Sequence, residues 1–391
     1  MKRAPFLTRT LLAALALAAS TTAQAQPIVD AARRFSERFF PYAPGSVVEM
    51  RIDRNTATPF GTYLALTAVR TTDKNTDGDQ MGLLVDQEMR TVAAGILIPF
   101  PPATPPVTPE NLARFVDEAL PAALGEMFAT RVRVRWPAVP ARRGGVVPLV
   151  AEISTGYGWP RLPVSLAADG LYLAIGGVWP LDRDPREVRR ELLEGPEIQW
   201  DPGHENALVK VVEFSDYQCP ACKRAWSEVK PALVTFGDKA RHGMVNFPLV
   251  RNHPWAFRAA VAGACFGKLW PDKLLAFKEE LYRLQDTLTV SSVDDAALGF
   301  VAQHALAEPT FRACYLKDPA VDAVLRQMDL GQRLGVIGTP SYFANGEALP
   351  ANNKEVFTRR LQAIIAAGGK PEAAAEIAGE LQPAPTAKPS R

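Results

Sequence analysis

The sequence predicts two domains of different fold class. Residues 26–195 are expected to form an α+β domain with mainly antiparallel strands, because short segments there alternate apolar and polar residues as half-buried strands do. Residues 196–368 are expected to form an α/β domain. Its first strand, Ala207–Asp216, is nearly continuously apolar, which is typical of a strand buried on both faces, and long helical segments follow it.

The elements of the N-terminal domain follow from these periodicities. Apolar residues recur at helical spacing over residues 28–40, which predicts an opening helix. Asp184 and Pro185 predict the start of a helix that ends at Gly195. Between these helices, alternating or apolar runs predict strands at residues 48–53, 61–70, 81–100, 132–136 and 146–154, and a hairpin at 163–178 that turns at Asp169-Gly170. Thr108 and Pro109 predict the start of a further helix. No residue pattern in this domain predicts a catalytic site.

The C-terminal domain is predicted to combine strands with helices. After a helix that begins at Pro220, a second strand is expected at His242–Leu249. A hairpin around Ala344–Gly346 and a helix at Asn353–Ala367 complete the domain. Residues 369–391 form an Ala- and Pro-rich tail that is expected to be largely disordered. Helical spacing also recurs in four intervening segments, Pro254–Gly267, Pro271–Leu284, Ser292–Leu306 and Pro319–Leu334.

The first 25 residues have the pattern of a signal peptide. Lys2 and Arg3 form a basic n-region ahead of the apolar run Leu11–Ala19, which is too short to span a bilayer as a helix. Ala23–Ala25 then has the A-x-A form of a cleavage site. We therefore expect export to the periplasm or an equivalent compartment, and a soluble protein after cleavage of residues 1–25. An uncleaved membrane anchor is the alternative.

Composition and residue spacing argue against nucleic acid as a partner and against a bound metal or cofactor. With 44 basic and 42 acidic residues the net charge is only +2, so we expect no nucleic acid. The four histidines are scattered and the chain has a single Cys-x-x-Cys sequence, described below, so we expect no metal site and no cofactor. The turn at Asp73–Asp79 is similar to the start of a calcium loop. However, Leu84 stands where a ligand is required, so a hairpin turn is the favoured interpretation.

A Cys-Pro-Ala-Cys sequence stands where the buried strand meets a helix, formed by Cys219, Pro220, Ala221 and Cys222. The unpaired N–H groups and the dipole of a helix N-terminus favour a thiolate, which is the reactive form of cysteine. We therefore predict an exposed, nucleophilic Cys219 and a buried Cys222 that resolves the mixed disulfide. A metal-ligand pair and an inert disulfide are the alternatives.

A second motif lies far downstream, where Gly338-Thr339-Pro340 precedes the predicted hairpin. A Cys-Pro-x-Cys helix start, intervening helices and a distant Gly-Thr-Pro resemble the DsbA-like branch of the thioredoxin superfamily over residues 205–367. The resemblance implies a thioredoxin-like fold with a helical insertion. It also implies that Pro340 is cis beside the dithiol, and that the backbone of Thr339 pairs with an extended substrate chain.

The resemblance assigns roles to three more residues. Glu213 matches an acidic residue beneath the active site of DsbA-like enzymes, where it relays protons. Burial in the strand would raise the pKa of Glu213 and suit it to accept the proton of Cys222. A surface or ion-paired glutamate is the alternative. Cys265 and Cys314 match a second pair in many relatives, which implies a structural disulfide, with two buried free thiols as the alternative.

One departure from the family affects the expected redox potential. Strongly oxidising DsbA enzymes carry a histidine where this chain has Ala221. Because one contribution to the thiolate is then missing, we expect a potential less oxidising than about −120 mV, between those of DsbA and thioredoxin.

Together these features predict an exported enzyme, a thiol-disulfide oxidoreductase that forms disulfides in extracytoplasmic proteins. Its substrates are expected to be protein or peptide thiols, and a membrane redox protein is the expected partner that reoxidises it. A reductase or isomerase that uses residues 26–195 for dimerisation or substrate binding is the first alternative. A non-enzymatic binding protein is the second, and the intact dithiol with Thr339-Pro340 argues against it.

Overall fold

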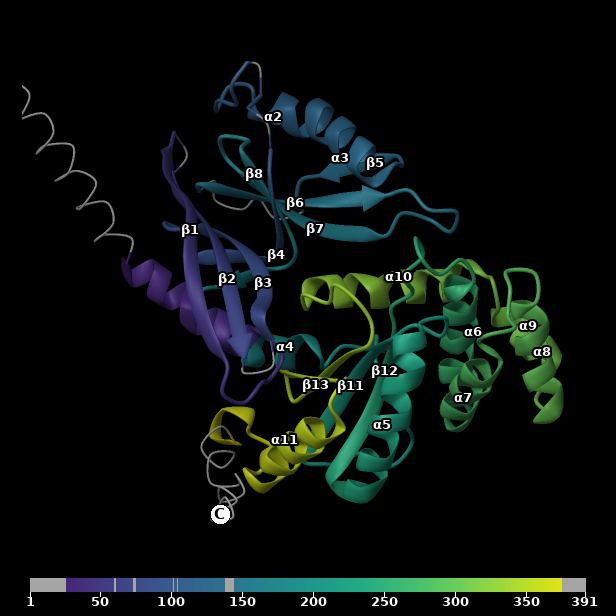
Figure 1. Cartoon of the computed structure of the whole chain (residues 1–391). Helices are drawn as coiled ribbons and strands as arrows, with labels where there is room; N and C mark the ends of the chain where they lie inside the picture. The colour runs from purple at the N-terminus through teal and green to yellow at the C-terminus, as the bar shows by residue number, and fades with distance from the viewer. Residues whose placement is uncertain are drawn as a thin grey trace, which may run out of the picture.

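Figure 1 shows the computed structural model, in which two separate sheets, one in each predicted domain, agree with the predicted fold classes. The predicted signal peptide and the tail after residue 374 lie outside the described residues, as do two residues of the Asp73–Asp79 turn. The structure describes residues 26–59, 61–72, 75–100, 102–103, 105–137 and 144–374.

The N-terminal half forms an antiparallel sheet. Among the described residues its strand order is β1-β2-β3-β4-β8-β7-β6-β5, and β9 pairs with β4. The strands are β1 (Val47–Thr58), β2 (Gly61–Thr72), β3 (Asn75–Asp86), β4 (Thr91–Pro99), β5 (Val132–Arg135), β6 (Val146–Ile153), β7 (Arg161–Ala167), β8 (Tyr172–Ile175) and β9 (Val178–Pro180).

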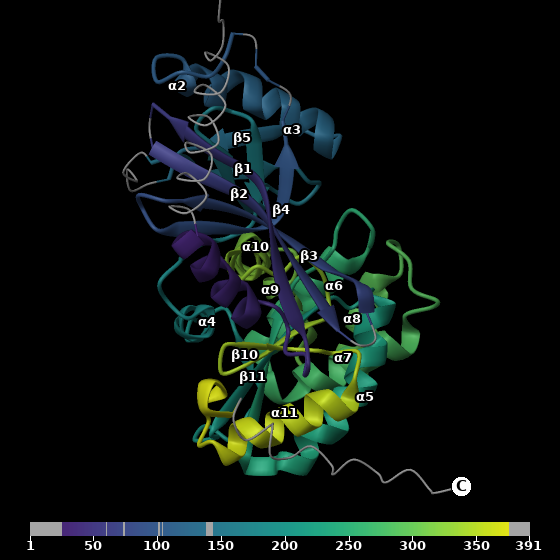
Figure 2. The ribbon, with the colours of Figure 1, turned by 60° about the vertical axis from the view of Figure 1, so that its left-hand side comes forward.

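Two helical segments cover this sheet at different places. The helix at residues 26–39 buries Phe35 in one cluster with Leu66 of β2. The second segment buries Leu120 in another cluster with Leu149 of β6. It lies at the end of the sheet that points away from the second domain (Figures 1 and 2). Its parts are α2 (Leu112–Arg114), the π-helical η1 (Phe115–Ala119) and α3 (Leu120–Phe128).

The second sheet has the order β10-β12-β11-β13-β14. Strand β11 pairs with β12 in parallel and with β13 in antiparallel orientation, so it lies in the middle of the sheet. All residues of β11 except Lys210 are buried, as its apolar sequence predicts. The strands are β10 (Gln199–Trp200), β11 (Val209–Ser215), β12 (Ala240–Asn246), β13 (Ser341–Ala344) and β14 (Glu347–Leu349).

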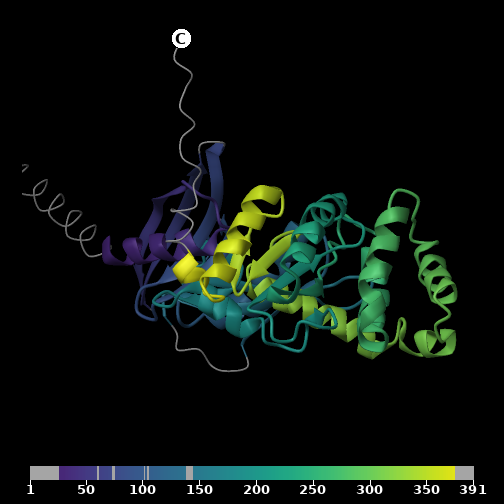
Figure 3. The same ribbon diagram turned by 90° about the horizontal axis from the view of Figure 1, so that it is seen from below.

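Helices cover both faces of the second sheet. Helices α5 and α11 pack against Val211 on one face, and α6 and α10 pack against Phe214 on the other. With α6, helices α7, α8 and α9 form the helical insertion, which Figure 3 shows on the side away from α11. Among the described residues, no helix combines the length and the apolar character that crossing a bilayer requires. The helices are α5 (Pro220–Phe236), η2 (Gly237–Lys239), α6 (Ala256–Leu269), η3 (Pro271–Lys273), α7 (Leu274–Leu284), α8 (Val293–Gln303), α9 (Glu308–Cys314), α10 (Asp318–Arg333) and α11 (Lys354–Ala366).

Helix α4 (Pro185–Leu192) joins the two sheets through a buried arginine. Arg189 lies within an aromatic cage of Phe39, Trp179 and Phe343, of which Phe343 belongs to β13. Its guanidinium carbon is 4.2 Å from the centroid of the Phe39 ring, and its Nη2 donates a hydrogen bond of 2.9 Å to the Phe39 carbonyl oxygen. The cage therefore links the N-terminal half to the strand that follows Pro340.

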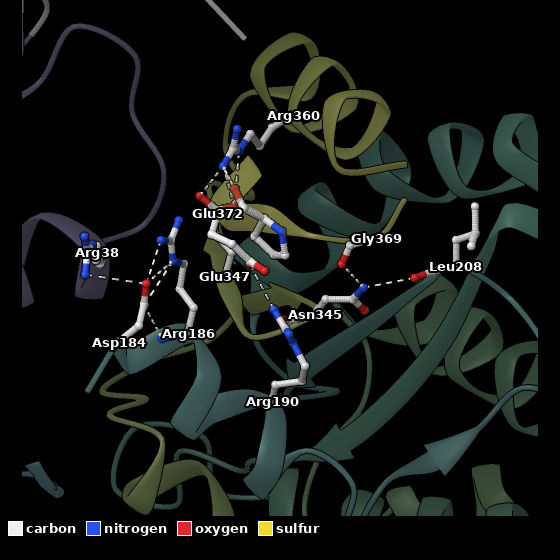
Figure 4. Close-up of polar contacts among 11 residues, drawn as sticks. Arg38, Asp184, Arg186, Arg190, Leu208, Asn345, Glu347, Arg360, Gly369 and Glu372 are labelled. Carbon is white, nitrogen blue, oxygen red and sulfur yellow. Dashed lines mark hydrogen bonds and ion pairs between the residues drawn. The ribbon is translucent and has the colours of Figure 1, made fainter. Parts of the chain in front are cut away.

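Further contacts surround the β13–β14 hairpin. Figure 4 shows Nε of Arg190 donating to the carbonyl oxygen of Asn345, in the hairpin turn, at 3.1 Å. Near the start of β13, Gly335 has a φ of +77°, and a Cβ on it would lie 2.5 Å from the ring of Phe39. A side chain is therefore excluded at residue 335 both by backbone conformation and by space. The N-terminal half thus supports the segment that carries Pro340.

Candidate active site

A turn held by Asp216 leads the chain from β11 into α5. The buried carboxylate of Asp216 accepts hydrogen bonds from the backbone N–H groups of Gln218, at 2.7 Å, and Leu249, at 2.8 Å. It also lies 2.7 Å from Nδ1 of His253. After this turn Cys219 is the N-cap residue of α5, with an extended backbone (φ −72°, ψ 117°). Its thiol therefore stands where unpaired N–H groups favour negative charge.

The loop that contains Thr339 and Pro340 faces the thiol of Cys219. The Thr339–Pro340 peptide bond is cis, and the carbonyl oxygen of Thr339 lies 3.5 Å from Sγ of Cys219. From the other side, Nε2 of Gln285 donates to the carbonyl oxygens of Tyr217, at 2.8 Å, and Cys219, at 3.2 Å. The fold thus brings the two motifs together across 120 residues of sequence.

The two thiols differ in their preference for charge. A hydrogen bond from the Cys222 thiol lowers the pKa of Cys219 to about 5, and it outweighs the opposite effect of burial. Backbone N–H groups of Cys222 and Ala221 act in the same direction. Burial, followed by the interaction with Cys219, raises the pKa of Cys222. In the reduced protein at neutral pH, Cys219 is therefore a thiolate and Cys222 a thiol.

The prediction that Cys219 is exposed is wrong, because the residue is only 5% exposed. It belongs to a cluster with Cys222, Trp226 and Tyr282, since helix α7 packs against the first turns of α5. Cys222 has no exposed surface at all. The two cysteines therefore differ more in the charge they favour than in exposure.

Glu213 does not have the raised pKa that its place in a buried strand predicts. Burial alone would raise the pKa, but the charge of Lys278 and a hydrogen bond from His242 outweigh burial and lower it to about 2. Nζ of Lys278 lies 2.6 Å, and Nε2 of His242 3.1 Å, from the same oxygen, Oε2 of Glu213. Glu213 is thus a buried, ion-paired carboxylate at neutral pH, which is the alternative named above.

Lys278 was missed by the sequence analysis. It is fully buried on α7, and its Nζ lies 3.7 Å from the centroid of the Trp226 ring. A signal was present, because Lys278 follows Leu274 by four residues and precedes Leu281 by three, on the apolar face of the helix. A lysine at such a position requires a buried partner of opposite charge.

The remaining cysteines are joined to each other. A disulfide between Cys265 and Cys314, the pair that the resemblance implies, links α6 to the end of α9. Cys219 and Cys222 are free thiols in this structure. Within the part of the chain that the structure describes, no group of three or more His, Cys, Asp or Glu side chains is placed to hold a metal ion.

Replacing both Cys265 and Cys314 with alanine is expected to lower the free energy of unfolding by about 4 kcal/mol. The reason is that the cross-link closes a loop of about 50 residues and thereby reduces the conformational entropy of the unfolded chain. Urea denaturation under non-reducing conditions measures the loss. A Cys219→Ser/Cys222→Ser variant is the control, since it removes two cysteines and keeps this disulfide. A loss below about 1 kcal/mol would contradict a stabilising role.

The fold and the site define a thioredoxin-like dithiol domain: a central strand runs into a Cys-x-x-Cys helix start, and a cis-proline faces it. A family model described as Thioredoxin matches residues 199–365. The "Probable disulfide bond formation protein D" of Bacillus anthracis is 30% identical over 176 residues, which cover 43% of this chain and 79% of that protein. Among solved structures, BdbD from Bacillus subtilis (oxidised) has a TM-score of 0.38 and 21% sequence identity, covering 44% of this chain and 94% of that chain.

A different relative shares only part of its length with this chain. The Na(+)/H(+) antiporter NhaA 1 of Mycolicibacterium gilvum is 33% identical over 139 residues, which cover 33% of this chain and 21% of that protein. The chain thus spans about a fifth of the antiporter's length. Through its C-terminal half, the chain belongs to the DsbA-like thiol-disulfide oxidoreductases of the thioredoxin superfamily.

Proposed function

We propose that this chain is an exported thiol-disulfide oxidoreductase that forms disulfides in extracytoplasmic proteins. The observation that carries the proposal is the contrast between two neighbouring thiols, since the pKa of Cys219 is lowered to about 5 whereas the pKa of Cys222 is raised. This contrast suits Cys219 to be the sulfur that exchanges with substrate sulfurs, and Cys222 to be the sulfur that resolves the mixed disulfide. The predicted signal peptide and the Cys265–Cys314 disulfide support export, because structural disulfides persist outside the cytoplasm.

In the oxidising direction, a substrate thiolate attacks Sγ of Cys219 in the Cys219–Cys222 disulfide, and the sulfur of Cys222 leaves. A second substrate thiolate then displaces Cys219, so the substrate gains a disulfide and the enzyme is reduced by two electrons. We infer that the substrate chain pairs with the backbone of Thr339, whose carbonyl oxygen lies 3.5 Å from the Cys219 sulfur. A membrane redox protein is the partner proposed to restore the disulfide.

The sign of the Cys219 pKa shift supports the oxidising direction. A thiolate that the fold favours stabilises the reduced state. This stabilisation is fully present above the ordinary cysteine pKa and is lost as the pH falls through about 5. A stabilised reduced state makes the disulfide a stronger oxidant. A pKa of about 5 lies between about 3.5 in DsbA and about 7 in thioredoxin, so we expect a potential between about −120 and −270 mV.

Titration of the reduced protein tests this proposal. The rate at which iodoacetamide alkylates Cys219 should be half-maximal near pH 5, and equilibration with glutathione buffers should give the intermediate potential. Ala221→His is the matched variant, because a cation at this position favours the thiolate; we expect it to lower the pKa of Cys219 and make the potential more oxidising. Half-maximal alkylation near the ordinary cysteine value of about 8.5 would count against the proposal.

A further inference from the structure

A row of buried polar side chains leads from the interior of the dithiol domain to the edge of its sheet. Oε2 of Glu213 faces Nε2 of His242 at 3.1 Å, and Nδ1 of His242 lies 2.9 Å from Oδ2 of Asp201. Asp201 directly follows β10, the strand at the sheet edge. The side chain of Asp201 is 20% exposed, that of His242 5%, and that of Glu213 not at all. The imidazole therefore bridges a fully buried carboxylate and one that reaches solvent.

The inner end of this row lies close to Cys222. Tyr342 stands directly opposite Glu213 in the register of β11 and β13. Cys222 shares a buried cluster with Trp226, whose ring centroid lies 3.7 Å from Nζ of Lys278 and 5.1 Å from the ring centroid of His242. Burial, followed by the charges of Glu213 and Cys222, raises the pKa of Tyr342, in agreement with this placement. Among the described residues, the Tyr342 hydroxyl and Oε1 of Glu213 are buried and have no other hydrogen-bond partner, and the interaction of the phenol with Glu213 contributes to its raised pKa. Both atoms are thus available to a proton that moves between Glu213 and Cys222.

The groups packed around His242 favour its protonated form. Asp201 beside β10 and Glu213 on β11 are carboxylates, Lys278 on α7 is paired with Glu213, and α5 contributes the uncharged ring of Trp226. Burial lowers the pKa of His242, but the two carboxylates outweigh burial and raise it. Glu213 itself has a pKa of about 2 and cannot retain a proton at neutral pH. Of these two groups, His242 is the one suited to store a proton.

We propose that His242, held in place by Asp201, stores the proton that Cys222 takes up and gives back, and that Glu213 only passes this proton on. The inference rests on the proposed function. Within the described part of the chain, no hydrogen bond joins His242 or Asp201 to a dithiol sulfur, so both are positioning residues that act through Glu213.

The proposed step balances within the protein. When a substrate thiolate attacks Cys219, the Cys219–Cys222 bond breaks, a substrate–Cys219 disulfide forms, and the electron pair of the broken bond leaves on Sγ of Cys222. That buried thiolate takes one proton through Glu213 from Nε2 of His242. His242 remains as a neutral imidazole with its other proton on Nδ1, next to Asp201. The proton returns to Nε2 when Cys222 is deprotonated and attacks a mixed disulfide on Cys219.

Two reactions of the full chain separate this role from a structural one. Reaction of the oxidised protein with dithiothreitol requires a proton at Cys222, whereas alkylation of Cys219 in the reduced protein by iodoacetamide does not. We expect His242→Gln to slow the first reaction about 100-fold and to remove an inflection from its pH profile, while alkylation changes by less than about twofold. Asp201→Asn keeps the shape of the side chain and should slow the first reaction about 10-fold. The exposed His304 provides the matched control, His304→Gln, which should change neither rate.

Two results with His242→Gln would overturn the proposed role of His242. Equal slowing of both reactions would show a structural role for His242 and overturn the proposal, and so would an unchanged reaction with dithiothreitol. If His242→Gln does not fold, the ratio of the two rates in Asp201→Asn decides in the same way. A wild-type protein that does not react with dithiothreitol would overturn the proposed function as well, and this result is distinguishable because it needs no variant.

Discussion

Replacing Cys219 with serine is expected to reduce disulfide transfer to the uncatalysed background, a loss of at least about 1,000-fold. A hydrogen bond from the Cys222 thiol, helped by the backbone N–H groups at the start of α5, lowers the pKa of Cys219 to about 5, and a serine hydroxyl in that place is neither ionised nor able to form a disulfide. The measurement is the oxidation of a peptide with two cysteines by a stoichiometric amount of protein.

Cys222→Ala is the matched variant, because it removes the other thiol of the same motif together with its hydrogen-bond donor and has a different expected result. In this variant the sulfur of Cys219 is still a nucleophile, but it loses the hydrogen bond from the Cys222 thiol, so the pKa of Cys219 should rise above about 5. Without a resolving thiol, mixed disulfides with substrates should accumulate as bands that disappear when a gel sample is reduced. Identical behaviour of the two variants, or full activity of Cys219→Ser, would contradict the proposed division of roles.

The dithiol could be predicted from sequence because its chemistry depends mostly on a local pattern. A buried strand followed by Cys-Pro-Ala-Cys fixes the thiol of Cys219 at a helix start, whatever the rest of the chain does. The chemistry of Glu213 depends on distant residues instead. Burial alone predicts a raised pKa, and the sign is reversed by Lys278, which comes from α7, 65 residues later. No pattern near Glu213 contains that information.

Two other features were not predicted from the sequence: a very short strand, and a contact built by residues from separate segments. Strand β10 has two residues, too few for a periodicity, yet its pairing with β12 places Asp201 beside His242. Helix α4 was predicted, but the cage around its Arg189 is built by aromatic residues from separate segments. The sequence therefore predicted the N-terminal domain, but it did not predict that Arg189 connects this domain to the dithiol domain.

A second large effect is expected at a buried ion pair behind the cis-proline hairpin. Arg360 of α11 is 1% exposed, and its guanidinium donates to both carboxylate oxygens of Glu347 on β14, at 2.7 to 3.1 Å (Figure 4). Burial raises the pKa of Glu347 although Arg360 opposes the shift, so this carboxylate depends on its partner. Arg360→Met leaves that carboxylate buried and unpaired, and should lower the free energy of unfolding by about 3–5 kcal/mol.

Chemical denaturation of two further variants isolates the cause. Arg359→Met changes the exposed neighbouring arginine and should cost less than about 0.5 kcal/mol. A double Glu347→Leu/Arg360→Met variant should recover most of the loss, because apolar side chains of similar volume replace a buried ion pair at little cost. If the double variant is as unstable as Arg360→Met, the loss comes instead from the other contacts of Arg360, its stacking on Tyr42 at 4.2 Å and its hydrogen bond to the carbonyl oxygen of Pro371 at 3.0 Å. Because β14 pairs with β13, which begins directly after Pro340, recovered stability should also preserve the geometry of the loop that faces the dithiol.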